Sequence, residues 1–230
     1  MAIYAIGDLH LSHSQEKPMH IFGPDWTDHA ARIESNWNAM VGPDDFVIVI
    51  GDISWAMHLK DALPDLEWLS GLTGTKLLIR GNHDYWWSSI GKVRSELPPG
   101  LLALQNDHYT WDDWAICGTR GWVCPGEDGF DNEHDQKIYL REAQRLQLSL
   151  ESARKSSSSP IIAALHFPPY NRQAEPSAFT NLLEQYAVEI CVFGHIHDPG
   201  RDFIHQGVLN GVDYRFAAAD GINFTPLKLT

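Results

Sequence analysis

The chain has 230 residues, which is enough for one sizeable domain with a buried core. Its 17 Lys and Arg against 30 Asp and Glu give a formal net charge of −13. This charge argues against a protein that grips long duplex nucleic acid, because such binding depends on neutralising many phosphates. The charge is compatible with a small phosphorylated substrate, since bound cations reverse the sign of the local charge in a carboxylate-rich pocket.

Short apolar runs bounded by turn-forming residues recur along the chain. Five of them predict strands buried on both faces, at residues 3–6, 46–50, 76–79, 161–165 and 190–193. Segments of helical character lie between them, at residues 26–40, 59–72, 133–155 and 177–186. The alternation of the two kinds of segment predicts an α/β fold.

The C-terminal third follows another pattern. Glycine-punctuated runs at residues 208–209, 212–216 and 222–224 predict consecutive antiparallel strands. A further hairpin is predicted over residues 108–117, with its turn within residues 111–114. Added to the alternating segments, these hairpins predict two packed sheets between helices. No linker divides the chain, so we expect a single domain.

The cysteines and the apolar runs indicate the cellular compartment of the protein. Cys117, Cys124 and Cys191 are odd in number and lack the paired spacing of zinc-binding motifs, so we expect reduced thiols in a cytoplasmic protein. No apolar run approaches the roughly 18 residues of a membrane span, and none is expected. Asp8 and His10 stand where a signal peptide needs apolar residues, so we expect no signal peptide. Nothing in the chain locates a dimer surface, and a homo-oligomer stays open.

Residues suited to metal binding follow each of the five predicted strands. They are Asp8 and His10, then Asp52, then Asn82, His83 and Asp84, then His166, and finally His195 and His197. The carboxyl ends of strands form the rim where α/β sheets bind ligands. One such ending is typical of a turn or a helix cap, whereas five along one rim indicate a metal site. Histidines two residues apart on an extended segment point the same way, which also suits a metal ion.

The residue types indicate which metals and which chemistry. Two divalent cations about 3.5–4 Å apart polarise a phosphoryl group and activate water for in-line attack. Holding two cations so close requires a shared anionic ligand. Imidazole and oxygen donors without cysteine suit Mn, Fe, Zn, Co or Ni better than copper(I), and the many histidines make magnesium alone less suitable. We expect two divalent metal ions, with Mn or Fe favoured.

The five blocks closely resemble the signature of the calcineurin-like metallophosphoesterase superfamily. That signature is Asp-x-His, Gly-Asp, Gly-Asn-His-Asp/Glu, a lone His and Gly-His-x-His, and it runs here in order from Gly7 to His197. The resemblance implies a four-layer αββα sandwich of two mixed β-sheets flanked by helices. It also implies that residues 1–230 form a single metallophosphoesterase domain.

The resemblance further implies two ligand sets that share one carboxylate. One metal ion would take Asp8, His10, Asp52 and His197, and the other would take Asp52, Asn82, His166 and His195. His83 would protonate the leaving oxygen, and Asp84 would orient His83 and raise its pKa. Many relatives carry an acidic residue three positions after the bridging Asp, where this chain has Trp55.

The function that this implies is hydrolysis of a phosphomonoester or phosphodiester. Two alternatives are a nuclease acting on short or single-stranded nucleic acid and a non-catalytic metal-binding regulatory module. The complete ligand set together with His83 favours an enzyme. Arg120 and Arg172 suit either an anionic part of the substrate or ordinary ion pairs. Residues 118–129 are glycine-rich without a phosphate-loop ending, and predict a loop that shapes selectivity.

Overall fold

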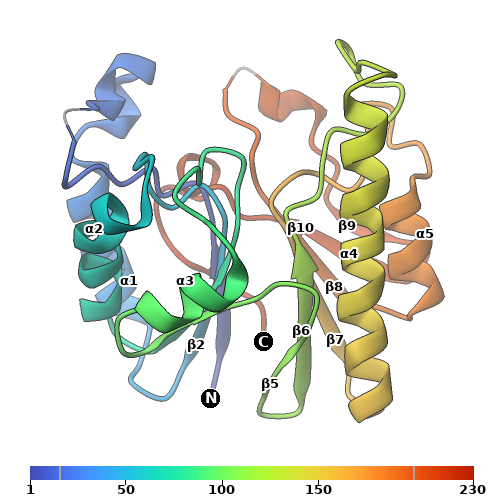
Figure 1. The fold of residues 1–230 in the computed structure, drawn as a ribbon, viewed down its shortest axis with the longest axis horizontal. Helices are drawn as coiled ribbons and strands as arrows, with labels where there is room; N and C mark the ends of the chain where they lie inside the picture. The colour runs from blue at the N-terminus through green and yellow to red at the C-terminus, as the bar shows by residue number, and fades with distance from the viewer. Residues whose placement is uncertain (16, 199) are drawn as a thin grey trace. The chain divides into compact units, whose positions relative to one another are not determined.

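The computed structural model describes residues 1–15, 17–198 and 200–230. The chain divides into two compact units, one made of Met1–Ala103 and Ala217–Thr230 and the other of Leu104–Phe216. Each unit contains one mixed β-sheet with helices beside it (Figure 1). Two mixed sheets flanked by helices are the α/β fold that the sequence implies.

The sheet of the first unit has five strands in the order β11-β1-β2-β3-β4. They are β1 Ile3–Ile6, β2 Phe46–Ile50, β3 Thr75–Ile79, β4 Leu101–Ala103 and β11 Leu227–Lys228. Strands β1 to β4 are parallel, and β11 runs antiparallel to β1. The helices are α1 His29–Met40, α2 Leu59–Gly71 and α3 Ile90–Glu96, with 3-10 turns η1 Met19–Phe22, η2 Pro24–Trp26 and η4 Ala219–Ile222.

Strand β2 lies in the middle of this sheet and is apolar throughout. All five of its residues are buried, as expected for a strand covered on both faces. Trp37 of α1 and Leu66 of α2 belong to the same buried cluster as Val47 and Val49 of β2. Figure 1 shows α1 and α2 next to each other beside the sheet. Burial of these apolar surfaces, at roughly 25 cal/mol per Å², holds the strand ends in place.

Lys76 of β3 is a charged residue inside this apolar unit, with an exposed fraction of only 1%. Its Nζ donates to the carbonyl of Leu72, to that of Gly74 at 2.9 Å and to that of Ser70 at 3.1 Å. The carbonyls of Ser70 and Leu72 lie at the C-terminal end of α2, where helical carbonyls lack partners within the helix and the dipole is negative, and that of Gly74 lies just beyond it. Lys76 therefore caps the C-terminal end of α2. Burial lowers the pKa of its ammonium group to about 8.

The sheet of the second unit has six strands in the order β5-β6-β7-β8-β10-β9. They are β5 Tyr109–Trp111, β6 Trp114–Thr119, β7 Ile161–Leu165, β8 Ile190–Phe193, β9 Gly207–Leu209 and β10 Val212–Phe216. Strands β6, β7, β8 and β10 are parallel, whereas β5 and β9 run antiparallel to β6 and β10.

Two helices, α4 Asp135–Ser156 and α5 Ala178–Gln185, lie together beside this sheet, and η3 Gly200–Phe203 follows β8 (Figure 1). Tyr139 and Phe179 join the two helices edge to face, with ring centroids 5.1 Å apart. Ser177 caps α5 by accepting from the amides of residues 179 and 180. In the described part of the chain, no helix combines the length and the apolar character that a membrane crossing requires.

The three cysteines are unpaired thiols in the second unit. All three are buried, and burial raises the pKa of both Cys117 and Cys124 to about 12. Thiols of this kind stay protonated at neutral pH and are poor nucleophiles. Their state matches the reduced cysteines expected from the sequence.

The predicted elements are mostly confirmed, with two corrections. The five core strands are present, and residues 108–117 contain the predicted hairpin, with Trp111 opposite Trp114. Residues 222–224 are not a strand, because Ile222 ends η4 and the next two residues have positive φ. Helix α1 begins at His29 rather than at residue 26, because Asp28 has a φ of 51°. The sequence had not predicted α3 or β4.

Replacing Lys76 with Met should make the stability of the protein less sensitive to alkaline pH. The folded pKa of about 8 lies below the usual 10.5, so the unfolded chain binds more protons between these values. The free energy of unfolding of the wild type should therefore rise as the pH increases from 8 to 10.5, relative to that of Lys76→Met. Urea unfolding of both proteins across this range measures the difference. Lys92→Met, at an exposed position of α3, serves as the control. A difference between wild type and Lys76→Met that does not change with pH would contradict the assignment.

Candidate metal centre

The loops that follow β1 and β2 lie side by side in the first unit. The amide of Asp8 donates to the carbonyl of Gly51, and the amide of His10 donates to the carbonyl of Asp52, each at 2.9 Å. These bonds continue the parallel pairing of the two strands beyond their carboxyl ends. The loops carry predicted ligands because adjacent parallel strands end at the same edge of the sheet.

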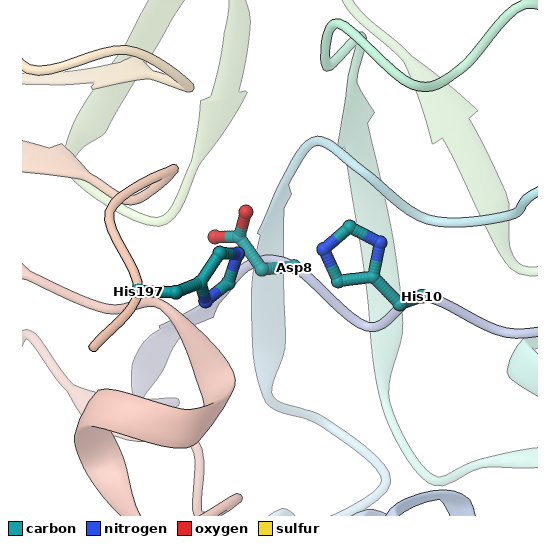
Figure 2. Close-up of side chains that lie close together, drawn as sticks. All are labelled: Asp8, His10 and His197. Carbon is teal, nitrogen blue, oxygen red and sulfur yellow. The ribbon is translucent and has the colours of Figure 1, made fainter. Parts of the chain in front are cut away.

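The side chains of Asp8, His10 and Asp52 are buried, with exposed fractions of 0%, 4% and 2%. Asp8 and His10 come from the same short segment (Figure 2), and one ligand atom of each lies within 4.8 Å of the other. The Nε2 atom of His10 is 4.0 Å from Oδ2 of Asp52. Burying two carboxylates is costly unless cations or hydrogen-bond donors compensate them. The three side chains therefore fit the predicted metal ligands.

The backbone at these positions is strained. Asp8, His10 and Asp52 have φ values of 58°, 47° and 50°, and His195 of the second unit has 72°. Residues other than glycine seldom adopt positive φ, and each instance costs on the order of 1–3 kcal/mol. Strain of this kind gathers at functional sites. Its presence at four predicted ligand positions favours a metal site over ordinary turns.

Gly81 allows the loop after β3 to approach Asp52 closely. A Cβ atom at position 81 would lie 2.1 Å from both the amide nitrogen and Oδ1 of Asp52. The same Oδ1 accepts a hydrogen bond of 2.8 Å from the amide of His83. The glycine of the Gly-Asn-His-Asp block is thus required by close contact with the carboxylate of the neighbouring loop. Asn82, between these two residues, is partly buried.

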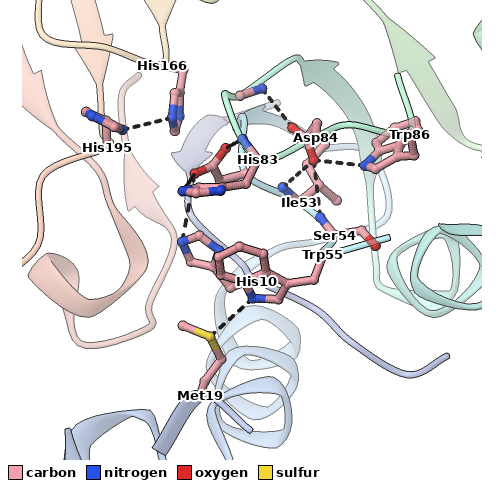
Figure 3. Close-up of polar contacts among 12 residues, drawn as sticks. His10, Met19, Ile53, Ser54, Trp55, His83, Asp84, Trp86, His166 and His195 are labelled. Atoms are coloured by element: carbon pink, nitrogen blue, oxygen red, sulfur yellow. Dashed lines mark hydrogen bonds and ion pairs between the residues drawn. The ribbon is translucent and has the colours of Figure 1, made fainter. Parts of the chain in front are cut away.

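Asp84 is fully buried, and its carboxylate joins the loops after β2 and β3. It accepts hydrogen bonds from the amides of Gly81 at 2.7 Å, Ile53 at 2.9 Å and Ser54 at 3.2 Å, and from Nε1 of Trp86 at 2.9 Å (Figure 3). Burial and the nearby Asp52 carboxylate raise the pKa of Asp84, while the amide donors oppose the rise. The predicted action of Asp84 on the His83 ring stays a prediction.

Trp55 packs against two of the predicted imidazoles. Its ring is stacked on His10, with centroids 4.8 Å apart and planes at 23°, and lies 4.6 Å from the ring of His83. Its Nε1 donates to the sulfur of Met19 at 3.2 Å (Figure 3). Here an aromatic ring restricts the orientation of both imidazoles.

His83 is more accessible than the buried Asp8, His10, Asp52 and Asp84 of these three loops. Its side chain is 36% exposed, and its Nε2 is 3.9 Å from Oδ2 of Asp52. The backbone of His83 is fixed by the hydrogen bond to Asp52, whereas its ring faces Trp55 and, edge-on, Tyr85. An imidazole held in this way can exchange a proton with a bound molecule.

Asp65 of α2 is a buried carboxylate that the sequence reasoning missed. It accepts from the amide of His13 at 2.8 Å, contacts Nδ1 of the same residue at 2.7 Å and accepts from Oγ of Ser54. It thereby ties α2 to the loops after β1 and β2. The sequence does contain a signal for its burial, because Asp65 lies on the apolar face of α2 beside Leu66 and Leu69. His13 is thus bound to this carboxylate through both its backbone and its ring.

The second unit brings His166 and His195 together at the ends of β7 and β8. Nδ1 of His195 is 3.2 Å from Nε2 of His166 (Figure 3). Two imidazoles on one tetrahedral zinc ion, with Zn–N distances of about 2.0–2.1 Å, have nitrogens about 3.3–3.4 Å apart. The pair therefore fits two ligands of a single ion. His197 follows two residues later and is partly buried (Figure 2).

Both arginines that sequence reasoning had considered for substrate binding make ion pairs. Arg120 contacts the buried Glu142 of α4 at 3.2 Å. Arg172 contacts Glu127 at 2.6 Å. These contacts support the structural interpretation of the two arginines.

The family model of the calcineurin-like phosphoesterases matches residues 1–199. Gene 66 protein of Mycobacterium phage L5 is 38% identical over 77 residues, which cover 34% of this chain and 37% of the phage protein. Among solved structures, a phosphopantetheinyl hydrolase from Mycobacterium tuberculosis aligns with a TM-score of 0.56, and a protein of unknown function from Aquifex aeolicus with 0.52. Each alignment covers 99% of this chain and 95% of the other at 15% identity, which indicates a shared fold.

Gly81→Ala should weaken metal binding, because the new methyl group would displace the Asp52 carboxylate or the loop that carries it. We expect at least a tenfold loss of Mn²⁺ affinity by calorimetry and a loss of stability of about 1–3 kcal/mol. Gly91→Ala is the matched control, since a Cβ there meets nothing within 4 Å and lies in helix α3. It should be neutral or stabilise by up to about 1 kcal/mol. Wild-type metal affinity in Gly81→Ala would show that this close contact is unimportant.

Proposed function

Because the chain belongs to the calcineurin-like phosphoesterase family, we propose that it hydrolyses a small phosphomonoester or phosphodiester with the help of two divalent cations. The observation that carries this proposal is the group of Asp8, His10 and Asp52, whose side chains are buried and whose φ values are positive. We further propose that residues 1–230 act as one metallophosphoesterase domain, since the predicted ligands come from both units.

We assign seven ligands to the two cations. Asp8, His10, Asp52 and His197 would hold one ion, and Asp52, Asn82, His166 and His195 would hold the other. The spacing of the His166 and His195 nitrogens supports the second set. Nitrogen and oxygen donors favour Mn or Fe, with Zn, Co or Ni as alternatives.

The bound cations would polarise the phosphoryl oxygens and make a water nucleophilic at neutral pH. The protein positions the groups around them. Asp52 is fixed by the amide of His83 and, through its own carbonyl, by the amide of His10. The protonated ring of His83, partly exposed beside Trp55, would donate its proton to the leaving oxygen.

Asp84 would act as a positioning residue. Its buried carboxylate holds the amides of Ile53 and Gly81, on the loops that carry Asp52 and His83. Moving either loop would misplace the leaving-group donor relative to the phosphorus, and small misplacements cost rate steeply.

A cytoplasmic location suits the protein, because its buried unpaired thiols are typical of reducing compartments. The net charge of −13 is unsuited to long duplex nucleic acid. The accessible His83 favours a catalyst over a metal-binding module.

The proposed function is tested by paired chromogenic assays after reconstitution with Mn²⁺, one with an aryl phosphomonoester and one with a diester. Turnover of either substrate that disappears on chelation is the expected result. Metal binding without turnover of either would overturn the proposal and support a regulatory module. Faster cleavage of a short single-stranded oligonucleotide than of both small esters would instead support the nuclease.

The proton-donor assignment predicts different losses for two substitutions. Asp52→Asn should lose metal and activity together. His83→Ala should keep most of the metal but lose on the order of 10²–10⁴-fold in kcat, because the leaving oxygen would depart unprotonated. The loss should be smaller for an ester whose leaving group needs no proton.

The control for this pair is His20→Ala, at an exposed histidine. It should behave as the wild type in metal content and rate. Wild-type rates of His83→Ala on an ester with a poor leaving group would refute the assignment.

A further inference from the structure

A cavity of about 170 Å³ lies within the second unit, with His195 in its wall. We call it the His195 pocket. Its apolar lining comes from the loop after β6, the segments after β7 and β8, and η3, and includes Val123, Cys124, Phe167, Tyr170, Ile196 and Phe203. Residues 123 and 124 belong to the glycine-rich loop for which the sequence predicted a role in selectivity.

The polar side chains of the His195 pocket are engaged with other protein groups. Arg172 pairs with Glu127 at 2.6 Å and lies over the ring of Phe203 at 4.5 Å. The Asn171 side chain donates to the carbonyl of Pro125 at 3.0 Å and to a carboxylate oxygen of residue 175 at 2.7 Å. A charged ligand would have to break these bonds, whereas an apolar group leaves them intact. The lining therefore favours an apolar occupant.

His195 connects the pocket with the proposed chemistry. Its ring packs against Phe167, with centroids 3.9 Å apart, and both rings line the cavity. Its Nδ1 faces Nε2 of His166 at 3.2 Å. One imidazole thus has its ring against the pocket and a nitrogen in the pair of proposed metal ligands. A group in the pocket would therefore lie beside one of the proposed metal ligands.

We propose that the His195 pocket binds the apolar part of the substrate's alcohol group, so that the preferred substrates are phosphoesters of alcohols bearing a phenyl-sized apolar group. The inference rests on the proposed function. An apolar cavity of about 150 Å³ accommodates benzene, so the volume suits one ring. The hydrolysis is unchanged: water forms a new bond to phosphorus, the bond to the ester oxygen breaks, and the alcohol leaves with a proton.

The test compares 2-phenylethyl phosphate with ethyl phosphate in the Mn²⁺-loaded enzyme. Their alcohols have similar acidity, so the ratio of the two kcat/KM values reports on the apolar group rather than on the leaving oxygen. We expect a preference for the phenyl ester on the order of 10–100-fold. Val123→Phe fills the pocket and should reduce the ratio to a few-fold. Val208→Phe, at a position of β9 that is 76% exposed, should keep the wild-type ratio.

A binding measurement separates the two proposals. Saturation-transfer NMR with 2-phenylethanol should detect binding to the metal-free wild type and to Val208→Phe, but not to Val123→Phe. If Val123→Phe fails to fold, Phe203→Ala, at a half-exposed wall position, should lower the ratio and the NMR signal.

The outcomes are distinct. Turnover of both esters with equal kcat/KM in the wild type, or an unchanged ratio in both pocket variants, would overturn the pocket proposal alone. Absence of turnover with metal bound would overturn the proposed function, and the NMR result would still decide whether the pocket takes an apolar ring.

Discussion

Asp52 is the residue on which the site of the first unit depends. Its carbonyl accepts the amide of His10, and its carboxylate accepts the amide of His83. The loops after β1, β2 and β3 therefore meet at one residue, and Gly81 has no space for a Cβ because the amide and the carboxylate of Asp52 lie there. A carboxylate used in this way is positioned before any cation binds, which reduces the reorganisation that metal binding requires.

Two further buried acids hold the loops around Asp52 in place. Asp84 binds backbone amides of the loops after β2 and β3, and Asp65 joins the loops after β1 and β2 to α2 through His13 and Ser54. Buried carboxylates are costly unless hydrogen-bond donors or cations compensate them. The cost of burying them and the positive φ of Asp8 and His10 are offset by the apolar packing of β2, α1 and α2. The apolar core thus stabilises the strained backbone of the loops at the carboxyl ends of the strands.

The second unit contributes a smaller and more apolar set of groups. His166 and His195 supply nitrogens at a spacing suited to one ion, while the ring of His195 also lines an apolar pocket. The ion pair with Glu127 neutralises the positive charge of Arg172 in the lining of that pocket. At 15% identity to two solved structures, what is shared with them is the fold.

The sequence by itself determined the core strands and the order of the proposed ligand blocks, because buried parallel strands are local apolar runs and neighbouring parallel strands of one sheet end at the same edge. Only the tertiary structure decided which groups surround those blocks. The contacts of Asp65 with His13, of Trp55 with His10, and of Asp84 with Ile53 join residues that are distant along the chain. No local pattern encodes such partners, since they depend on how strands and helices pack. The same reason explains why residues 222–224 form a turn and why Lys76 is buried at the end of α2.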